Sequence, residues 1–223
     1  MYQLYYHPGN ASLAPHAVLE EIGAEYELVF VDRAHDQHKS APYLKLNPSG
    51  RIPVLIDGDL ALFETAAICL HLADRHPEAG LAPAPGSTAR AHFYKWLMYL
   101  ATTLQTELIT YFYPERLADD AAGTAQVKRH AEERVGGMLD ILEAELAGNG
   151  NGGAFLAGDA YSLADIYLMM LCRWTRGMGR PAAARPHLAR HIDRVAARPA
   201  IRRSFAAEGI EPPYFTLPGP AAK

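Results

Sequence analysis

A run rich in proline, glycine and alanine, PEAGLAPAPGST at residues 77–88, constrains the fold more than any other feature. Before it, the apolar pattern switches between strand-like alternation and helical spacing, whereas after it the long apolar segments repeat at helical spacing. Pro and Gly at this density interrupt helices and strands alike. We therefore predict an α/β domain over residues 1–77, a linker over 78–88 and an all-α domain over 89–223.

The first domain is predicted to contain a small sheet. YQLYY at 2–6 and EYELVFVD at 25–32 are typical of strands, and the segment 12–22 between them repeats at helical spacing and ends at Gly23. IPVLID and LALF flank Asp57-Gly58, which indicates a hairpin. A helix is expected at 64–76. In the second domain, Ser162 and Asp165 form a predicted capping box ahead of IYLMMLCRW.

Charge and composition argue against several classes of function. The net charge of −4 provides no basic surface for nucleic acid or for an anionic membrane. The longest uncharged apolar run, 166–172, is far shorter than the roughly 20 residues that span a bilayer. Cys69 and Cys172 stand in apolar helical patterns, so we expect buried, reduced thiols and a cytoplasmic protein. No motif predicts a metal site.

The stretch YYHPGNASLAPH, residues 5–16, places amide and hydroxyl side chains at a strand-to-helix turn. Asn10 and Ser12 could donate hydrogen bonds to an anionic atom there, aided by the positive end of the helix dipole. The alternative is that both residues simply cap the helix.

A second candidate stretch is NPSGRIPVLIDGDLALFET, residues 47–65. If the Ile52–Pro53 bond is cis, the Ile52 backbone could pair with an extended, peptide-like ligand; otherwise Pro53 is an edge-strand proline without a ligand. Thr65 and the helix N-terminus suit a carboxylate, while Glu64 could accept from an ammonium group. Together they fit both ends of an α-amino acid, although they could also merely cap their helix.

These stretches, with AAICLHLAD and FLAGDAYSLADIYL, resemble the glutathione S-transferase superfamily in order and separation. The resemblance implies a thioredoxin-like first domain joined to a helical second one. It covers both predicted domains, and the opening stretch is most similar to the bacterial beta-type enzymes. Family members are usually homodimers, so the resemblance also implies a homodimer.

The resemblance further implies a glutathione site with no metal. Ile52, beside a cis Pro53, would pair with the cysteinyl backbone, and Glu64 and Thr65 would hold the γ-glutamyl group. The glycine carboxylate would be bound by His38 or Lys39, and Arg51 would assist.

The sequence departs from the beta type at the reacting atom. Ala11 occupies the position of the beta-type cysteine, and Gln105 that of its helical-domain histidine. Cysteine-based chemistry is therefore not expected. Ser12 resembles the hydroxyl of serine-type enzymes, Asn10 the amide of nu-type enzymes, and Tyr5 lies near the position that tyrosine-type enzymes use. We rank Ser12 first and Asn10 second as the group that stabilises the glutathione thiolate.

The second substrate is expected to be a small hydrophobic electrophile, in a pocket between the domains. Its candidate lining residues are Tyr111, Phe112, Tyr113, Trp174, Arg116 and Arg173. At helical spacing such aromatics could equally be core residues. The predicted function is a glutathione transferase. The alternatives are a glutathione-dependent disulfide reductase without a protein cysteine, and a non-catalytic binding or scaffold protein of the same fold.

Overall fold

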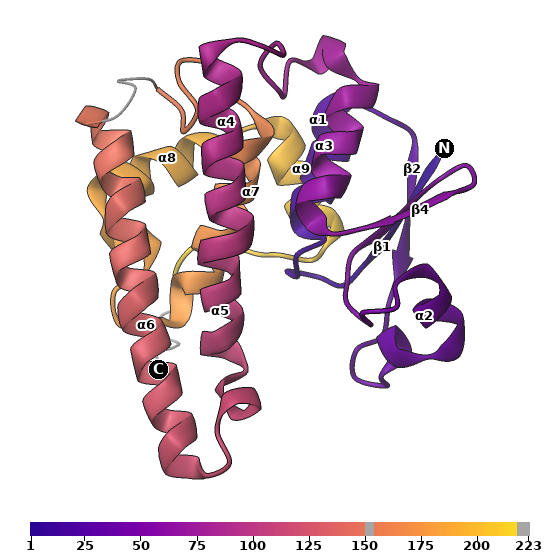
Figure 1. The fold of residues 1–223 in the computed structure, drawn as a ribbon. Coiled ribbons are helices and arrows are strands. Elements are labelled where there is room, and N and C mark those ends of the chain that lie inside the picture. Colours follow the sequence, from indigo (N-terminus) through magenta and orange to yellow (C-terminus); the bar gives the residue numbers. More distant parts are fainter. Residues whose placement is uncertain (150–153, 218–223) are drawn as a thin grey trace, which may run out of the picture. The chain divides into compact units, whose positions relative to one another are not determined.

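The computed structural model describes residues 1–149 and 154–217, and the chain divides into two compact units. The first unit comprises residues 1–82 and 196–211, and the second comprises 83–195 and the segment from 212 onward. The last six residues of the predicted helical domain, 218–223, lie outside the described residues. Figure 1 labels the elements of both units.

The first unit is built on a mixed sheet that has four strands within the described residues, in the order β2-β1-β3-β4. Its strands are β1 (Tyr2–Tyr6), β2 (Tyr26–Phe30), β3 (Val54–Asp57) and β4 (Leu60–Phe63). Its helices are α1 (Leu13–Ile22), α2 (Ala41–Leu46), α3 (Thr65–Arg75) and α9 (Pro199–Ala207). β1 and β2 run parallel, joined through α1, whereas β3 pairs antiparallel with both β1 and β4.

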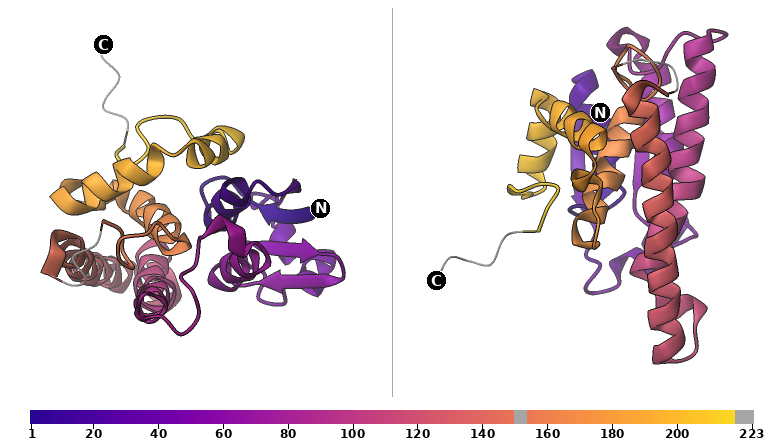
Figure 2. Two further views of the ribbon diagram at one scale, coloured as in Figure 1. Left: turned by 90° about the horizontal axis from the view of Figure 1, so that it is seen from above. Right: turned by 90° about the vertical axis from the view of Figure 1, so that its left-hand side faces the viewer.

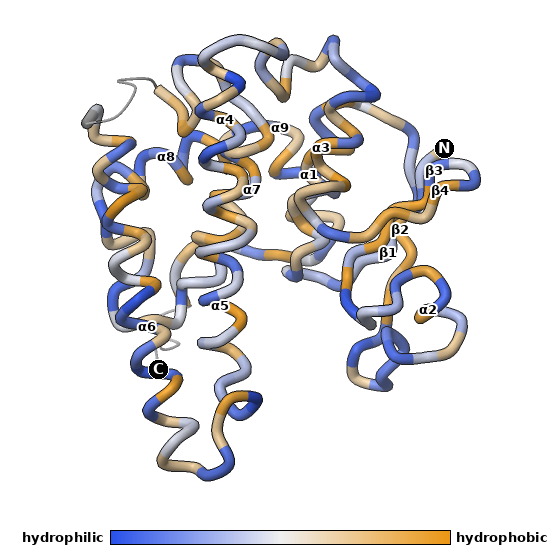
Figure 3. The backbone as a smooth tube through the Cα atoms, viewed as in Figure 1, coloured by the Kyte–Doolittle hydropathy of each residue, from blue (hydrophilic) through white to orange (hydrophobic). Residues whose placement is uncertain are grey.

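The two faces of the sheet pack against different helices. Leu4 and its partner Leu55 are fully buried, on the face that α1 and α3 cover. Tyr5 and its partner Val54 lie on the opposite face, in a cluster with Tyr43 of α2. This alternation is what a sheet buried on both sides requires. Figure 3 shows the hydrophobic residues concentrated along these strands.

The helix α2 is an element that the sequence pattern does not predict. It has six residues, too few to show a clear helical periodicity. Its N-terminus is capped by Ser40, whose hydroxyl accepts from the Tyr43 N–H at 3.4 Å. The segment therefore depends on local capping and on burial of Tyr43 rather than on an apolar repeat.

The second unit is helical in the residues described. Its helices are α4 (Thr88–Met98), α5 (Gln105–Phe112), α6 (Ala121–Ala144), α7 (Leu163–Trp174) and α8 (Pro186–Ala196). A π-helical segment, Tyr99–Leu104, joins α4 to α5. Figure 1 shows α4 and α5 one after the other along one line, with α6 beside them, and the left view of Figure 2 shows these helices nearly end-on. In the described part of the chain, none of the helices combines the length and apolarity that crossing a bilayer requires.

The predicted capping box begins α7. The Ser162 N–H donates to Asp165 Oδ2 at 2.8 Å, and the Leu156 N–H donates to Asp165 Oδ1 at 2.9 Å. Asp165 is fully buried, and burial raises its pKa to about 6. The motif therefore fixes both the start of α7 and the loop before it, as a structural element of the second unit.

The C-terminal helix α9 belongs with the first unit, a feature that the division predicted from sequence does not anticipate. Ion pairs join α9 and its flanking residues to α1: Arg198 contacts Glu21 at 2.5 Å and Arg203 contacts Glu20 at 2.5 Å. Glu208, just after α9, contacts His16 at 2.8 Å with both side chains buried. Such pairs join residues almost two hundred positions apart, which no local pattern encodes.

We predict that Glu208→Ala destabilises the protein by about 1–3 kcal/mol, because it removes the buried carboxylate that bonds to the buried His16 ring and to the Gly9 N–H. Glu208 accepts from the Gly9 N–H at 2.7 Å and is bonded to His16 Nδ1. The measurement is the urea midpoint of the full chain. The control is Glu211→Ala, which removes an exposed carboxylate nearby. Equal midpoints for the two variants would contradict the prediction.

Candidate active site

Four chain segments leave the sheet at the same edge. The register pairs Tyr6 with Phe30, Tyr5 with Val54, and Val54 with Phe63. Because β1, β2 and β4 run in one direction and β3 in the other, the ends of three strands and the start of β3 meet there. The segments 7–12, 31–39, 52–53 and 64–65 therefore converge, and they contain most of the site residues predicted for this unit.

The turn after β1 is held by its own backbone and by Ser12. The Asn10 N–H donates to the His7 carbonyl at 3.1 Å, and Gly9 has a φ of 68°, in the region that favours glycine. The Ser12 hydroxyl donates to the His7 carbonyl at 3.1 Å and accepts from the His7 N–H at 3.3 Å. Ser12 is fully buried and makes no side-chain cap of α1. Its single proton is therefore used within the turn.

Asn10 is half-buried, and its Oδ1 accepts from Arg33 Nη1 at 3.4 Å. Tyr5, by contrast, packs edge-on against Tyr43 with 6.0 Å between ring centroids, in the cluster beneath α2. Of the three candidates, Ser12 is thus the one whose donor is used within the turn, whereas the NH2 group of Asn10 makes no hydrogen bond to another described residue.

The Ile52–Pro53 peptide bond is cis, as the family resemblance implies. The carbonyl of Arg51 accepts from Tyr43 Oη at 2.8 Å and from Asn47 Nδ2 at 2.7 Å, which holds the chain just before Ile52. Within the described residues, no protein group bonds to the Ile52 N–H or C=O. Backbone polar groups in folded proteins are normally paired, so the backbone of Ile52 presents a donor and an acceptor for an extended ligand.

Glu64 follows β4 and precedes the first residue of α3, Thr65. Glu64 has a φ of 74° and a ψ of 111°, a conformation that is uncommon for a residue with a side chain and recurs at functional sites. Its side chain is exposed and does not cap α3. Thr65 is buried, and the uncapped first turn of this helix offers backbone N–H groups to an anion.

His38 and Lys39 lie on the segment after β2, beside Gly50. A Cβ on Gly50 would meet the His38 carbonyl at 3.3 Å, a tight contact, and the φ of 61° at Gly50 also favours glycine. His38 Nδ1 is buried without a hydrogen-bond partner. Burial, reinforced by the charges of Arg33 and Lys39, lowers the pKa of His38. Lys39 is mostly exposed and pairs with Asp36 at 3.1 Å.

The predicted electrophile-pocket residues lie in the second unit. Phe112 contacts both Tyr111 and Trp174 edge-on, at 5.3 Å and 6.2 Å between ring centroids. Tyr111 and Trp174 are each 8% exposed, as core residues would be. The Arg116 guanidinium lies 4.0 Å from the Tyr113 ring centroid. These residues thus form an aromatic cluster and a separate cation–π pair.

Gln105 begins α5 directly after the π-helical segment, and its Oε1 accepts from the hydroxyl of Tyr167.

Both cysteines are free and buried, and burial raises the pKa of each thiol. Neither thiol is therefore available as a thiolate nucleophile at neutral pH. Among the described residues, no group of three His, Cys, Asp or Glu side chains could hold a metal ion.

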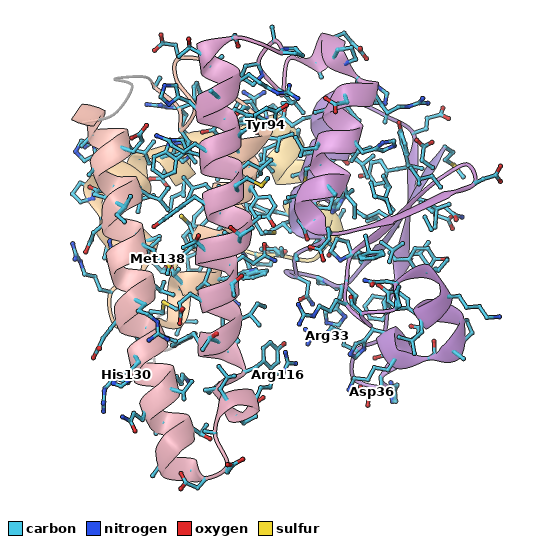
Figure 4. All side chains as sticks on the ribbon, in the orientation of Figure 1. Arg33, Asp36, Tyr94, Arg116, His130 and Met138 are labelled. Atoms are coloured by element: carbon cyan, nitrogen blue, oxygen red, sulfur yellow. The ribbon has the colours of Figure 1, made fainter. Side chains whose placement is uncertain are left out.

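Arg33 and Glu208 contact the turn, and sequence reasoning missed both. Arg33 belongs to a polar stretch that carries no recognisable motif, and Glu208 lies almost two hundred residues from the Gly9 N–H that it accepts. Figure 4 labels Arg33 and Asp36 on the segment that follows β2. The parallel pairing of β1 with β2 is the signal that could have brought Arg33 to the turn.

Residues 1–74 match the N-terminal domain of glutathione S-transferases, and residues 95–199 match the C-terminal domain. The chain is 36% identical to Glutathione S-transferase 3 of Zea mays over 202 residues, which are 88% of this chain and 89% of that protein. The chain belongs to the glutathione S-transferase family. This confirms the predicted family and fold class, and with them transferase chemistry that uses glutathione.

Solved glutathione S-transferases share the whole fold. A sphingomonad enzyme complexed with glutathione is 36% identical, with a TM-score of 0.80, and the match covers 94% of this chain and all of that one. A beta-class enzyme from Sphingomonas chungbukensis is 33% identical, with a TM-score of 0.81 and coverage of 94% and 100%. Beta-type bacterial enzymes are therefore among the relatives of this transferase. It differs from the beta type in the turn after β1, where it has Ala11 in place of a cysteine.

Proposed function

We propose that this transferase binds glutathione along the edge of the sheet, with the cysteinyl backbone paired to Ile52. The unpaired N–H and C=O of Ile52, next to the cis Pro53, are the observation that carries the proposal. A tripeptide laid antiparallel to this unit would satisfy both groups as an additional strand does. Extending the register of β3 and β4 by two residues puts Ile52 beside Thr65, so the γ-glutamyl end would reach α3.

The two ends of the tripeptide are assigned to different segments. The γ-glutamyl carboxylate would accept from the first-turn N–H groups of α3 and from Thr65, while Glu64 would accept from the ammonium group. The glycine carboxylate would lie near His38 or Lys39, with Arg51 assisting. The unpartnered Nδ1 of His38 supports this assignment, because a buried polar atom without a partner is rare unless a ligand supplies one.

Asn10 is the proposed donor to the glutathione sulfur, ahead of Ser12 and Tyr5. A thiol with a pKa of about 8.5 is a few per cent ionised at pH 7. Lowering that pKa by about two units requires about 2.7 kcal/mol of preference for the thiolate. One charge-assisted hydrogen bond supplies about 1.5–3 kcal/mol, and the N-terminus of α1 adds to it. Ser12 would have to release the His7 carbonyl to serve instead.

The proposed second substrate is a small hydrophobic electrophile. Phe112, which is 43% exposed beside the buried Tyr111 and Trp174, and the Arg116–Tyr113 pair support an apolar surface with a cationic edge. In the reaction, the thiolate sulfur forms a bond to an electrophilic carbon, and the leaving group departs with the bonding electrons.

A second candidate is glutathione-dependent disulfide reduction without a protein cysteine, which Asn10 beside Ala11 in the turn supports. Cys69 and Cys172 are the two cysteines of the chain, and both are buried. Glutathione thiolate would attack one sulfur of a disulfide and release the other as a thiolate. A second glutathione would then attack the mixed disulfide, which yields oxidised glutathione and the second free thiol.

We further propose that the protein is a cytoplasmic homodimer. The buried, unpaired cysteines support a reducing compartment, and the dimer is the usual assembly of the family. Analytical ultracentrifugation of the full chain tests the assembly, since a single species at the protomer mass of 24.4 kDa would exclude it.

We predict that Glu64→Ala weakens glutathione binding at least about tenfold, because the ammonium group loses a charged acceptor worth about 1.5–3 kcal/mol. Isothermal titration calorimetry measures the Kd. Asp59→Ala is the matched control, since it removes an exposed carboxylate from the β3–β4 turn of the same unit. Equal affinities for the two variants would exclude Glu64 from the site, and no heat with the unmodified protein would refute the proposed function.

Asn10→Ala is predicted to raise the pKa of bound glutathione by about one unit or more, which leaves less thiolate at neutral pH. Ser12→Ala is expected to move that pKa less and to lower stability instead, since the His7 N–H loses the Ser12 oxygen as acceptor and the His7 carbonyl loses one of its donors. The thiolate absorbance near 240 nm, titrated against pH at saturating glutathione, provides the measurement. A larger shift in Ser12→Ala would reverse the ranking.

We predict that the protein accelerates the reaction of glutathione with a chloronitrobenzene-type electrophile more than its reaction with hydroxyethyl disulfide, each compared with its own uncatalysed rate. Initial rates at equal glutathione concentration decide between the two enzymatic functions. The opposite order would favour the reductase. Saturable glutathione binding without turnover of either substrate would favour the non-catalytic alternative.

A further inference from the structure

Arg33 reaches the turn from the segment after β2. Its Nη1 donates to Asn10 Oδ1 at 3.4 Å, and the side chain is half-buried. The contact exists because β1 and β2 are parallel neighbours, so the residues that follow Tyr6 and Phe30 leave the sheet side by side. His7 Nδ1 also contacts the Val31 carbonyl at 3.0 Å, which fixes the two segments against each other.

The contact determines which end of the Asn10 amide can act. A guanidinium group has donors and no acceptor, so the atom that faces Arg33 must be the amide oxygen. With the oxygen held, the NH2 group points away from Arg33 with its two donors. An amide without such a partner could turn its oxygen toward an anion and repel it.

Arg33 also places a permanent positive charge beside the turn. The same charge, after burial, is a cause of the lowered pKa of His38, so its field extends over the neighbouring part of the site. Two carboxylates of this segment contact other basic side chains: Asp32 contacts His35 at 2.6 Å, and Asp36 contacts Lys39 at 3.1 Å. Glu208 brings a carboxylate to the same turn, where its Oε2 accepts from the Gly9 N–H at 2.7 Å and its Oε1 contacts His16 Nδ1 at 2.8 Å. Arg33 is the cation that contacts Asn10 itself.

We propose that Arg33 is a positioning residue for the thiolate: it holds the Asn10 amide with its NH2 toward the glutathione sulfur and adds positive charge near it. The proposal rests on the proposed function, in which the sulfur lies at Asn10. The thiol proton leaves to water, and the resulting anion is stabilised by the oriented amide and by the guanidinium charge. Arg33 acts through Asn10 and does not itself contact the reacting atoms.

The test compares Arg33→Gln, Arg33→Lys and the control Arg202→Gln, which removes an exposed arginine of α9. The pKa of bound glutathione is measured from the 240 nm absorbance against pH. We expect Arg33→Gln to raise it by about one unit, a tenfold loss of thiolate at a pH below the pKa. Arg33→Lys, which keeps the charge without the planar fork, is expected to shift it less, and Arg202→Gln not at all.

Calorimetry with S-methylglutathione separates positioning from simple binding, because this ligand has no ionisable thiol. Arg33→Gln should change its Kd less than threefold. An equal loss of affinity for S-methylglutathione and glutathione would instead make Arg33 a carboxylate-binding residue and overturn the proposal. In the double variant Asn10→Ala/Arg33→Gln, the pKa shift should be smaller than the sum of the single shifts, whereas additivity would also overturn it.

The outcomes for the unmodified protein distinguish this proposal from the function on which it rests. A thiolate signal that titrates identically in the unmodified protein and in Arg33→Gln would overturn the role of Arg33 alone. No thiolate signal in the unmodified complex would overturn both.

Discussion

The pairing register of β1 with its neighbours is the constraint on which the rest of the first unit depends. It buries Leu4 against Leu55 on one face and brings Tyr5 to Val54 on the other. A slip of one residue would reverse the two faces and expose the core, so the packing strongly fixes the register. The same register sets where the strands end, and therefore where Ile52 and the turn after β1 lie. Core packing thus determines the geometry of the candidate active site before any ligand is considered.

Some of the polar groups at this edge are already satisfied within the protein. Glu208 takes the Gly9 N–H, and the His7 backbone takes both capacities of the Ser12 hydroxyl. What remains is chiefly donors: the Asn10 amide, the first turn of α3 and the Ile52 N–H. A donor-rich edge suits a peptide that carries two carboxylates and a thiolate, with Glu64 as the acceptor for its ammonium group.

Local patterns predicted the fold well, because alternation, hairpin chemistry and the capping box at Ser162 are encoded within a few residues. They also located Pro53 and Glu64, whose turn and helix start have short sequence signals. They did not reveal the contacts of Arg33 or Glu208, which depend on strand order and on the return of α9 to α1. Nor could they separate Ser12 from Asn10, since that choice depends on which hydroxyl or amide the folded turn has already used.

Ala11 and Asn10 together restrict the chemistry that this site can perform. An amide can orient and stabilise an anion, but it cannot become a nucleophile or store a covalent intermediate as a cysteine does. The two cysteines that the chain has are buried, and their thiols are held protonated. No sulfur atom of the protein therefore takes part in the reaction, and the attacking sulfur in either reaction would be that of glutathione. Transfer to carbon and exchange with a disulfide then share one activated species and differ in the acceptor that meets it, so the surface that receives the second substrate decides between them.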